Sequence, residues 1–234
     1  MNCREIKSKR MGINFVKFNE EWINYLRLMR ERPELFQDDD RLKIVTNPEV
    51  VDDFEKKTGK RIGVVYQSEY HLFVVDLVED TEGYRFAYER LVPAVRKGAV
   101  VSIPIYKGKM VLLRQFRHAL RSVQYAFPRG FGEEGISVED NLRKEIKEEI
   151  GAEVQEVSHV GVVIADSGIA NNPVEVFVCD ISEPQLKKCY EGIEQVVLIS
   201  EGELEEWIAQ GMITDGYTLS GYMLYKCKQK TQIS

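Results

Sequence analysis

Apolar residues recur with two different periods along the chain, and the period changes near residue 60. Over residues 19–32 they recur at helical spacing, and Pro33 ends that segment. A second helix is expected over residues 48–57, with Gly59 as its stop. Residues 1–60 are therefore predicted to form a small helical annex.

Strand patterns begin at residue 61. Residues 61–93 contain three runs rich in β-branched and aromatic side chains, and we interpret them as a β-rich segment before the main domain. Strands that alternate with helices then continue to the end of the chain, which predicts an α+β fold built in layers. The further strands are expected at 98–106, 109–117, 157–165, 174–180 and 195–199, and the further helices at 202–210 and 218–228.

Residues 127–151 differ from the rest of the chain in their composition. Three glycines within six residues allow close approach of the backbone in the first half. The second half is predicted to be a helix, because Ser137 and Asp140 form a capping pair and Gly151 has the position of a C-terminal glycine.

The acidic side chains of this predicted helix gather on one side of it. At about 100° per residue, Glu145, Glu148 and Glu149 occupy one arc beside the buried edge, and Glu149 falls within the apolar arc. Repulsion between neighbouring carboxylates and partial burial are both unfavourable, and a divalent cation would reverse both effects. Oxygen ligands without His or Cys favour Mg²⁺ or Mn²⁺ over zinc. The alternative is a solvated helix face, which is common for charge-rich helices.

Length and charge narrow the classes of function. A chain of 234 residues is long enough to bury a full core, and its net charge of −6 argues against a general nucleic-acid binder. A phosphate ester substrate would need a cation as mediator. No apolar run is long enough for a membrane span, the N-terminal residues show no secretion signal, and the four cysteines form no C-x-x-C pair. We therefore expect a cytoplasmic protein with free thiols and no membrane partner.

Residues 130–152 resemble the box of the Nudix hydrolases, G-x5-E-x7-R-E-U-x-E-E-x-G-U, in which U is a bulky aliphatic residue. The matching positions are Gly130, Glu145, Ile146, Glu148, Glu149 and Gly151, and the departures are Ile136, Lys144 and Ala152. Residues 99–117 and 214–219 also resemble the ADP-ribose pyrophosphatase branch of that family, and Asp215-Gly216 is in addition a turn signal. The resemblance covers the chain from about residue 61 to its C-terminus.

The resemblance implies a Nudix-type α/β/α sandwich with a mixed sheet over residues 94–234. It implies hydrolysis of a nucleoside diphosphate linked to another moiety, with Mg²⁺ as cofactor, Mn²⁺ as a possible substitute, and ADP-ribose or another nucleotide sugar as the small-molecule substrate. It also implies a homodimer formed with the help of residues 61–93. Two alternatives stay open: a catalytically weak or inactive nucleotide-binding module, favoured by Ile136, Lys144 and Asn172, and a scaffold that acts through residues 1–60.

By the same resemblance, Glu145, Glu148 and Glu149 would hold the metal and carry catalysis, with the backbone carbonyl of Arg129 completing the site. Relatives place a general-base glutamate in a loop that corresponds here to residues 165–175. Asn171 and Asn172 fall near that position, and asparagine accepts no proton at neutral pH. Asp166, Glu175 or one of the box glutamates would have to replace the missing base, although Asp166 and Glu175 also fit a turn acid and an exposed strand residue.

Phosphate contacts are predicted for Arg114, Arg117 and Arg129, because guanidinium groups match phosphate geometry. The alternative for each is an ordinary surface arginine beside a strand. His118 follows Arg117, and we interpret it as a structural histidine. The aromatic residues that are candidates to stack on a base, with core packing as their alternative, are Tyr125, Phe127 and Phe131.

Overall fold

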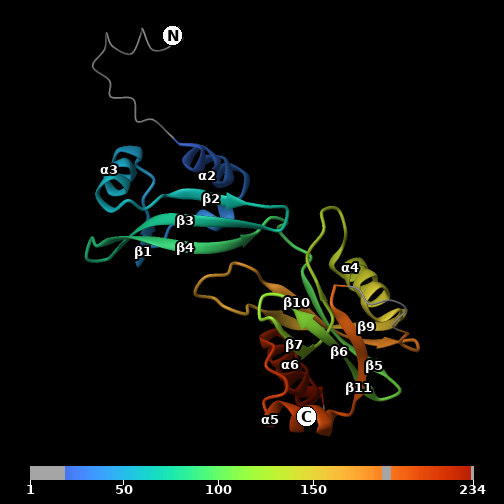
Figure 1. Cartoon of the computed structure of the whole chain (residues 1–234). Coiled ribbons are helices and arrows are strands. Elements are labelled where there is room, and N and C mark those ends of the chain that lie inside the picture. Colours follow the sequence, from blue (N-terminus) through green and yellow to red (C-terminus); the bar gives the residue numbers. More distant parts are fainter. Residues whose placement is uncertain (1–18, 186–190, 233–234) are drawn as a thin grey trace, which may run out of the picture. The chain divides into compact units, whose positions relative to one another are not determined.

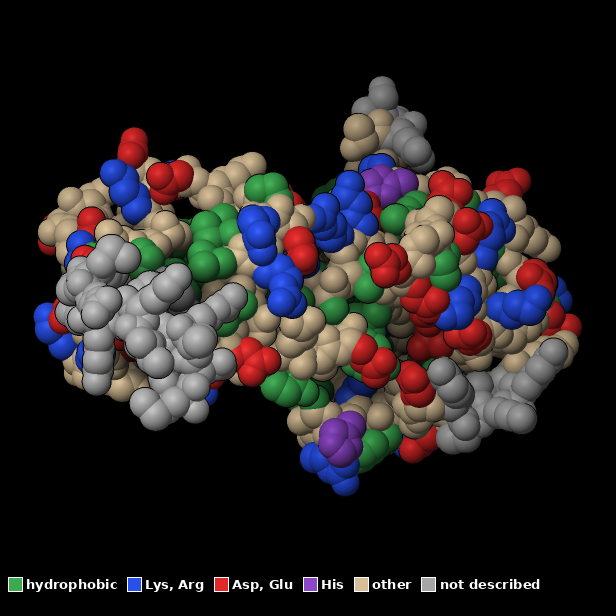
Figure 2. Space-filling model, turned by 90° about the horizontal axis from the view of Figure 1, so that it is seen from above, with side chains coloured by type: hydrophobic (Ala, Val, Ile, Leu, Met, Phe, Trp, Pro, Cys, Tyr) green, Lys and Arg blue, Asp and Glu red, His purple; other side chains and the backbone are tan. Residues whose placement is uncertain are grey.

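The computed structural model describes residues 19–185 and 191–232, and the chain divides into two compact units, Met1–Ala94 and Val95–Ser234 (Figure 1). Within these described residues, no helix combines the length and the apolar character that a membrane span requires. Acidic and basic side chains are interspersed on the face shown in Figure 2.

The N-terminal unit combines helices with a four-stranded antiparallel sheet. Strand β3 pairs with β4 along its length, with β2 at its beginning and with β1 at its end. Its elements are α2 (Glu20–Glu31), the 3₁₀ helix η1 (Pro33–Phe36), β1 (Leu42–Ile44), α3 (Pro48–Thr58), β2 (Gly63–Gln67), β3 (His71–Asp80) and β4 (Arg85–Pro93).

The helices and strands of this unit share one core. Helix α2 begins at Asn19, whose side chain accepts the backbone N–H of Trp22 at 2.9 Å. Its apolar stripe, with Trp22 and Tyr25, packs with Val74 and Leu77 of β3. The change in periodicity near residue 60 separates residues 1–60 from residues 61–93 in the sequence. In the structure the two ranges share one core, because neither an amphipathic helix nor a half-buried sheet can bury its apolar face alone.

The C-terminal unit contains a seven-stranded sheet with the strand order β11-β6-β5-β10-β9, to which β7 adds beside β6 and β8 beside β5. The sheet is mixed, because β10 runs parallel to β5 and antiparallel to β9. Its elements are β5 (Val100–Tyr106), β6 (Lys109–Arg117), β7 (Ser122–Ala126), β8 (Arg129–Gly130), α4 (Val138–Glu145), the π-helical segment η2 (Ile146–Ile150), β9 (Val154–Val163), β10 (Val174–Ile181), β11 (Ile193–Ile199), α5 (Glu201–Ala209) and α6 (Gly216–Gln232).

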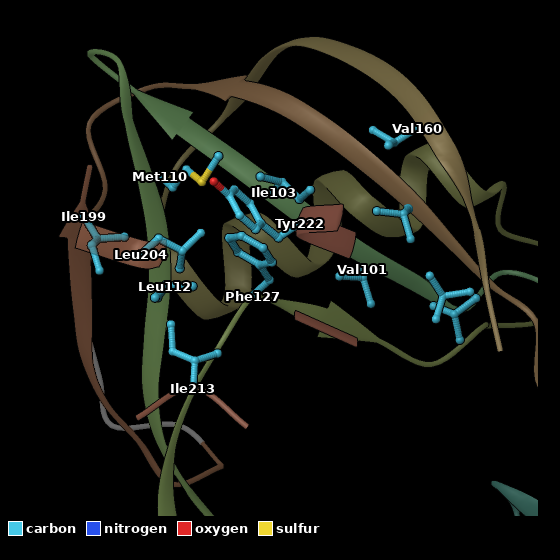
Figure 3. Packing of buried hydrophobic residues seen from close by; sticks show 13 residues of the cluster. Val101, Ile103, Met110, Leu112, Phe127, Val160, Ile199, Leu204, Ile213 and Tyr222 are labelled. Carbon is cyan, nitrogen blue, oxygen red and sulfur yellow. The ribbon is translucent and has the colours of Figure 1, made fainter. Parts of the chain in front are cut away.

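Helices cover both faces of this sheet, and each face has its own core. Val111 of β6 packs with Leu142 and Ile146 from α4 and η2, whereas Leu112 packs on the opposite face with Leu204 of α5 and residues of α6. Figure 3 shows this second core, with Leu112, Phe127 and Tyr222 pointing toward one another. The α/β/α sandwich with a mixed sheet that the sequence predicts is confirmed.

The helix over residues 138–150 departs from the prediction in its second half. It begins and ends as expected: Ser137 accepts the backbone N–H of Asp140 at 3.1 Å, and Gly151 has a left-handed φ of 73°. Residues 146–150, however, form a π-helical segment. Hydrogen bonds from i to i+5 widen the turn, so the rotation per residue is smaller than the α-helical value of about 100° that was used to place the glutamates.

Candidate active site

Glu145 and Glu149 form a pair of acidic side chains on the side of the helix that faces β8. Glu149 is only 6% exposed, and its Oε2 accepts the backbone N–H of Arg129 at 3.2 Å. Desolvation, with the charge of Glu145 adding to it, raises the pKa of Glu149 to about 8. Desolvation, with the charge of Glu148 adding to it, raises the pKa of Glu145 to about 7. Arg117 and Lys144 offset these effects only in part, so the protein compensates the charge of the acidic pair incompletely.

Glu148 differs from the other two glutamates because it lies on the exposed side of the π-helical segment. Its Oε2 lies 4.0 Å from the ammonium of Lys144. Among the residues that the structure describes, no three His, Cys, Asp or Glu side chains lie together as a group that could hold a metal ion. The structure thus brings Glu145 and Glu149 together and leaves Glu148 beside them at the surface.

Gly130 has a packing requirement that explains its presence in the loop. A Cβ atom built on Gly130 would lie 2.1 Å from Oε1 of Glu145, well inside van der Waals contact. The carboxylate of Glu145 therefore occupies the space that any side chain at position 130 would need. Gly130 is therefore needed because it has no side chain, which leaves room for Glu145 to pack against β8, and not because of an unusual backbone conformation.

Two side chains of α4 hold the glycine loop in place. Asn141 is fully buried, and its Nδ2 donates to the carbonyl oxygens of Gly98 at 2.8 Å and Phe131 at 2.7 Å. Lys144 forms an ion pair with Glu133 of the loop. The sequence analysis missed Asn141, although a polar residue next to Leu142 on a predicted buried edge is a signal for such a role.

Arg117 and Arg129 lie close enough for their charges to interact. Burial, with the charge of Arg129 adding to it, lowers the pKa of Arg117, and its enclosed Nε and Nη2 atoms have no hydrogen-bond partner. Nη1 of Arg129 donates to Oδ1 of Asp215 at 2.9 Å. Arg114, three residues before Arg117 on β6, points to the other face of that strand and pairs with Glu194.

The proposed replacements for the missing general base lie in other contacts. Oδ1 of Asp166 accepts the N–H of Gly168 at 2.9 Å within its own turn. Glu175 pairs with Nε2 of His159 at 2.7 Å at the surface. The side chain of Asn172 hydrogen-bonds to Tyr217. Asp166 and Glu175 therefore each have a local partner in the folded chain.

Glu191 is an acidic residue of this region that the sequence analysis missed. It precedes β11 in a left-handed conformation with a φ of 45°, and Nε2 of Gln115 donates to its carbonyl oxygen at 2.9 Å. Its charge acts on Arg117, Glu145 and Glu149. The signal in the sequence is a Glu-Gly turn immediately before a predicted strand.

The aromatic candidates separate into core and surface residues. Phe127 is 1% exposed and belongs to the core, and Tyr125 packs edge-on against Trp207 with ring centroids 4.9 Å apart. Phe131 is 51% exposed on the glycine loop. His118 is exposed, and its Nδ1 lies 2.9 Å from Nη1 of Arg121. Of the three aromatic side chains, that of Phe131 is therefore the most exposed.

Comparison with known proteins identifies the class to which this site belongs. Residues 96–210 match the family model of the NUDIX domain, and this segment contains the glycine loop, the acidic pair and both arginines. Residues 96–210 therefore match the Nudix family, as the resemblance predicts.

The proteins that are similar to this chain include two whose names describe an activity. ADP compounds hydrolase NudE of Escherichia coli (strain K12) is 35% identical over 99 residues, which are 42% of this chain and 52% of that protein, so the match spans about half of the relative. A solved structure described as an ADP compounds hydrolase aligns with a TM-score of 0.64 and 18% identity, covering 74% of this chain and 93% of the other. That structural likeness supports the fold.

Proposed function

We propose that this protein hydrolyses the diphosphate bond of a nucleoside diphosphate linked to another moiety. The observation that carries the proposal is the incompletely compensated acidic pair, Glu145 and Glu149, beside the two arginines Arg117 and Arg129 within the NUDIX segment. The name of the Escherichia coli relative makes ADP compounds the first class to test. We take ADP-ribose as the first substrate.

A divalent cation fits the donor chemistry of this site. Two carboxylates that lose solvation and repel each other gain most from a hard cation. Glu145, Glu148 and Glu149, with the carbonyl oxygen of Arg129, would hold Mg²⁺ or Mn²⁺. Such an ion, when bound, neutralises phosphate charge and lowers the pKa of an attacking water.

The chain's own residues have separate roles in this proposal. The guanidinium group of the half-buried Arg117 and the remaining N–H groups of Arg129 bind phosphate oxygens. Gly130 keeps Glu145 against β8. The proton of the attacking water goes to a carboxylate, for which we propose Glu191 first and Asp166 second, because Asp166 is already bound within its own turn.

A second candidate function is a nucleotide-binding module without turnover. It is favoured by Lys144 in place of an arginine, by Ile136 in place of a loop carboxylate, and by Asn172, which is engaged with Tyr217. Both candidates require nucleotide binding at the same site, so binding alone does not separate them.

Turnover with a matched pair of variants separates the two candidates. The full chain is incubated with ADP-ribose and a phosphatase that releases phosphate from the products, with MgCl₂ or with EDTA. We expect Mg²⁺-dependent phosphate release that falls by about 100-fold or more in Glu149→Gln, since an ionised group of a metal-dependent centre is lost. Glu139→Gln, exposed on the same helix, is the control. Saturable binding of ADP compounds without turnover would favour the binding module.

The homodimer and the cytoplasmic location are also proposals that rest on the family resemblance. Sedimentation of the full chain at several concentrations tests the dimer. A monomer at all concentrations would remove residues 61–93 from that role.

A further inference from the structure

Helix α6 begins beyond the segment that matches the NUDIX family model, yet its first turn contacts the proposed phosphate-binding residues. The match ends at residue 210, and α6 spans Gly216–Gln232. Asp215, immediately before the helix, accepts Nη1 of Arg129 on its Oδ1 at 2.9 Å. The side chains of this ion pair are 28% exposed for Arg129 and 12% exposed for Asp215, so solvent screens it only in part.

The other oxygen of Asp215 is fixed by the start of α6. Oδ2 accepts the backbone N–H of Thr218 at 3.0 Å and its hydroxyl at 2.8 Å, as a helix N-cap does. Thr218 is fully buried, and its hydroxyl oxygen accepts the N–H of Phe127 at 3.0 Å. The carboxylate of Asp215 is therefore held on one side by the helix and the core, and presents its other side to Arg129.

Tyr217 adds a second contact to the same guanidinium. The Cζ atom of Arg129 lies 5.1 Å from the centroid of the Tyr217 ring, which is a favourable cation–π distance. Asn172 hydrogen-bonds to Tyr217 from the neighbouring loop. The ring and the carboxylate of Asp215 together restrict where the guanidinium of Arg129 can lie.

The neighbouring Arg117 explains why such restraint is needed. Two guanidinium groups in a partly buried site repel each other, and the negative charge of Asp215 acts on both of them. Without that charge, Arg129 would lower its energy by turning toward solvent.

We propose that Asp215 is a positioning residue that holds the guanidinium of Arg129 beside Arg117, so that both face the diphosphate of the substrate. This inference rests on the proposed function, because it takes the diphosphate as the ligand of the two arginines. It places the start of α6 within the working site, although that helix lies outside the NUDIX segment.

The decisive variant is Asp215→Asn. Its amide oxygen can still accept the bonds from Thr218 and cap α6, whereas its NH₂ group faces Arg129 and cannot accept from it. We expect kcat/KM for ADP-ribose with MgCl₂ to fall by about 10- to 100-fold, because a charge-assisted bond is lost, with KM rising more than kcat falls. The melting temperature should stay within about 2 °C of wild type, since the cap is kept.

A double-mutant cycle distinguishes positioning from general structural support. If Asp215 acts through Arg129, then Asp215→Asn adds less than about a twofold further loss in an Arg129→Met background. Asp180→Asn, at an exposed position of β10, is the matched control and should leave kcat/KM unchanged. Losses that multiply in the double variant, or an unchanged kcat/KM in Asp215→Asn, would overturn the inference.

A binding measurement keeps this test independent of turnover. Calorimetric titration of ADP with MgCl₂ into the wild type and Asp215→Asn should show affinity weakened by about 10-fold or more in the variant. Binding of this kind without hydrolysis would remove the proposed enzymatic function and retain the role of Asp215. If the wild type hydrolyses ADP-ribose but both proteins bind ADP with equal affinity, the proposed enzymatic function is retained and the role of Asp215 is removed.

Discussion

The two units of this protein bury charged side chains in contrasting ways. In the N-terminal unit, Asp76 is 2% exposed, and both of its oxygens accept from Arg90, at 2.5 Å and 2.9 Å. The hydroxyl of Tyr25 also donates to Asp76, and Nη1 of Arg90 donates to the carbonyl oxygen of Leu35 at 2.8 Å. Every buried charge of this network has a partner.

In the C-terminal unit, the corresponding groups are left without full compensation. Glu149 is 6% exposed and accepts one backbone N–H, its acidic neighbour Glu145 repels it, and Arg117 has two enclosed nitrogens without a partner. A buried charge that is fully paired indicates a structural role, whereas buried charges that stay unpaired indicate a site for a ligand. The comparison thus separates the core of one unit from the proposed active site of the other.

The largest effect is expected from breaking the paired network. Asp76→Ala leaves Arg90 buried without its counter-ion, and we expect it to lower the free energy of unfolding by about 3–5 kcal/mol. Denaturant unfolding of the full chain measures the change. Glu79→Ala on the same strand removes an exposed pair with Arg85 and should cost about 0–1 kcal/mol. Equal losses in both variants would contradict the structural role of the network.

Glu149→Gln should act in the opposite direction, since it removes an unpaired buried acid. The pKa of Glu149 rises from 4.5 to about 8 on folding, so the folded protein binds the proton more tightly. Wild-type stability should therefore fall as pH rises from about 4.5 to about 8. Glutamine does not ionise, so without metal the variant should be more stable than wild type by about 2–4 kcal/mol above pH 8, and equal to it near pH 4.

Unfolding curves at several pH values in EDTA test this, with Glu139→Gln as the control. MgCl₂ should stabilise the wild type more than Glu149→Gln and so narrow the difference, because a ligand of the folded state stabilises it. If the difference in the free energy of unfolding between Glu149→Gln and wild type instead increased toward pH 4, the predicted direction of the pKa shift of Glu149 would be wrong.

Arg117 and Arg114 offer a matched comparison on two faces of one strand. Arg117→Met removes the half-buried guanidinium group beside Arg129, and we expect kcat/KM for ADP-ribose to fall by about 10- to 100-fold. Arg114→Met breaks a surface pair with Glu194 and should change kcat/KM by less than about threefold. A larger effect at Arg114 would place the phosphate contacts on the other face of β6.

The smallest effect is expected at the ion pair between Lys144 and Glu133. Both side chains are more than a third exposed, so Glu133→Gln should change stability by about 0–1 kcal/mol and kcat/KM by only a few fold. Glu134→Gln, at the exposed neighbouring position, should have no effect. If the pair orients the loop, the exchanged variant Glu133→Lys with Lys144→Glu should recover what the single variants lose, and a further loss would exclude this role.

Much of the fold was predictable because it depends on local patterns. The turn signal at Lys107-Gly108 and the apolar run that follows it predict β6 with its correct ends, and the capping signals at Ser137 and Gly151 predict the limits of the helical segment. The π-helical segment η2 was not predictable, since nothing in its sequence distinguishes i to i+5 hydrogen bonding from i to i+4.

The candidate site was predictable in part, for a similar reason. Glu145, Glu149 and Gly130 are close in sequence, and one helix and one loop bring them together. Glu191 and Asp215 come from distant segments, and only the folding of the whole unit brings their charges to Arg117 and Arg129. Such long-range proximity has no periodic signal within a single sequence.

The close packing of Gly130 and Glu145 has a consequence for how this protein tolerates substitution. Gly130 has no left-handed φ, so the backbone itself would accept alanine, and the atom in the way is the end of a flexible side chain. Alanine at this position would therefore fold and move the carboxylate aside. A screen that reports only soluble expression would pass such a clone, and a screen for product would discard it. The two kinds of selection would disagree at this one position.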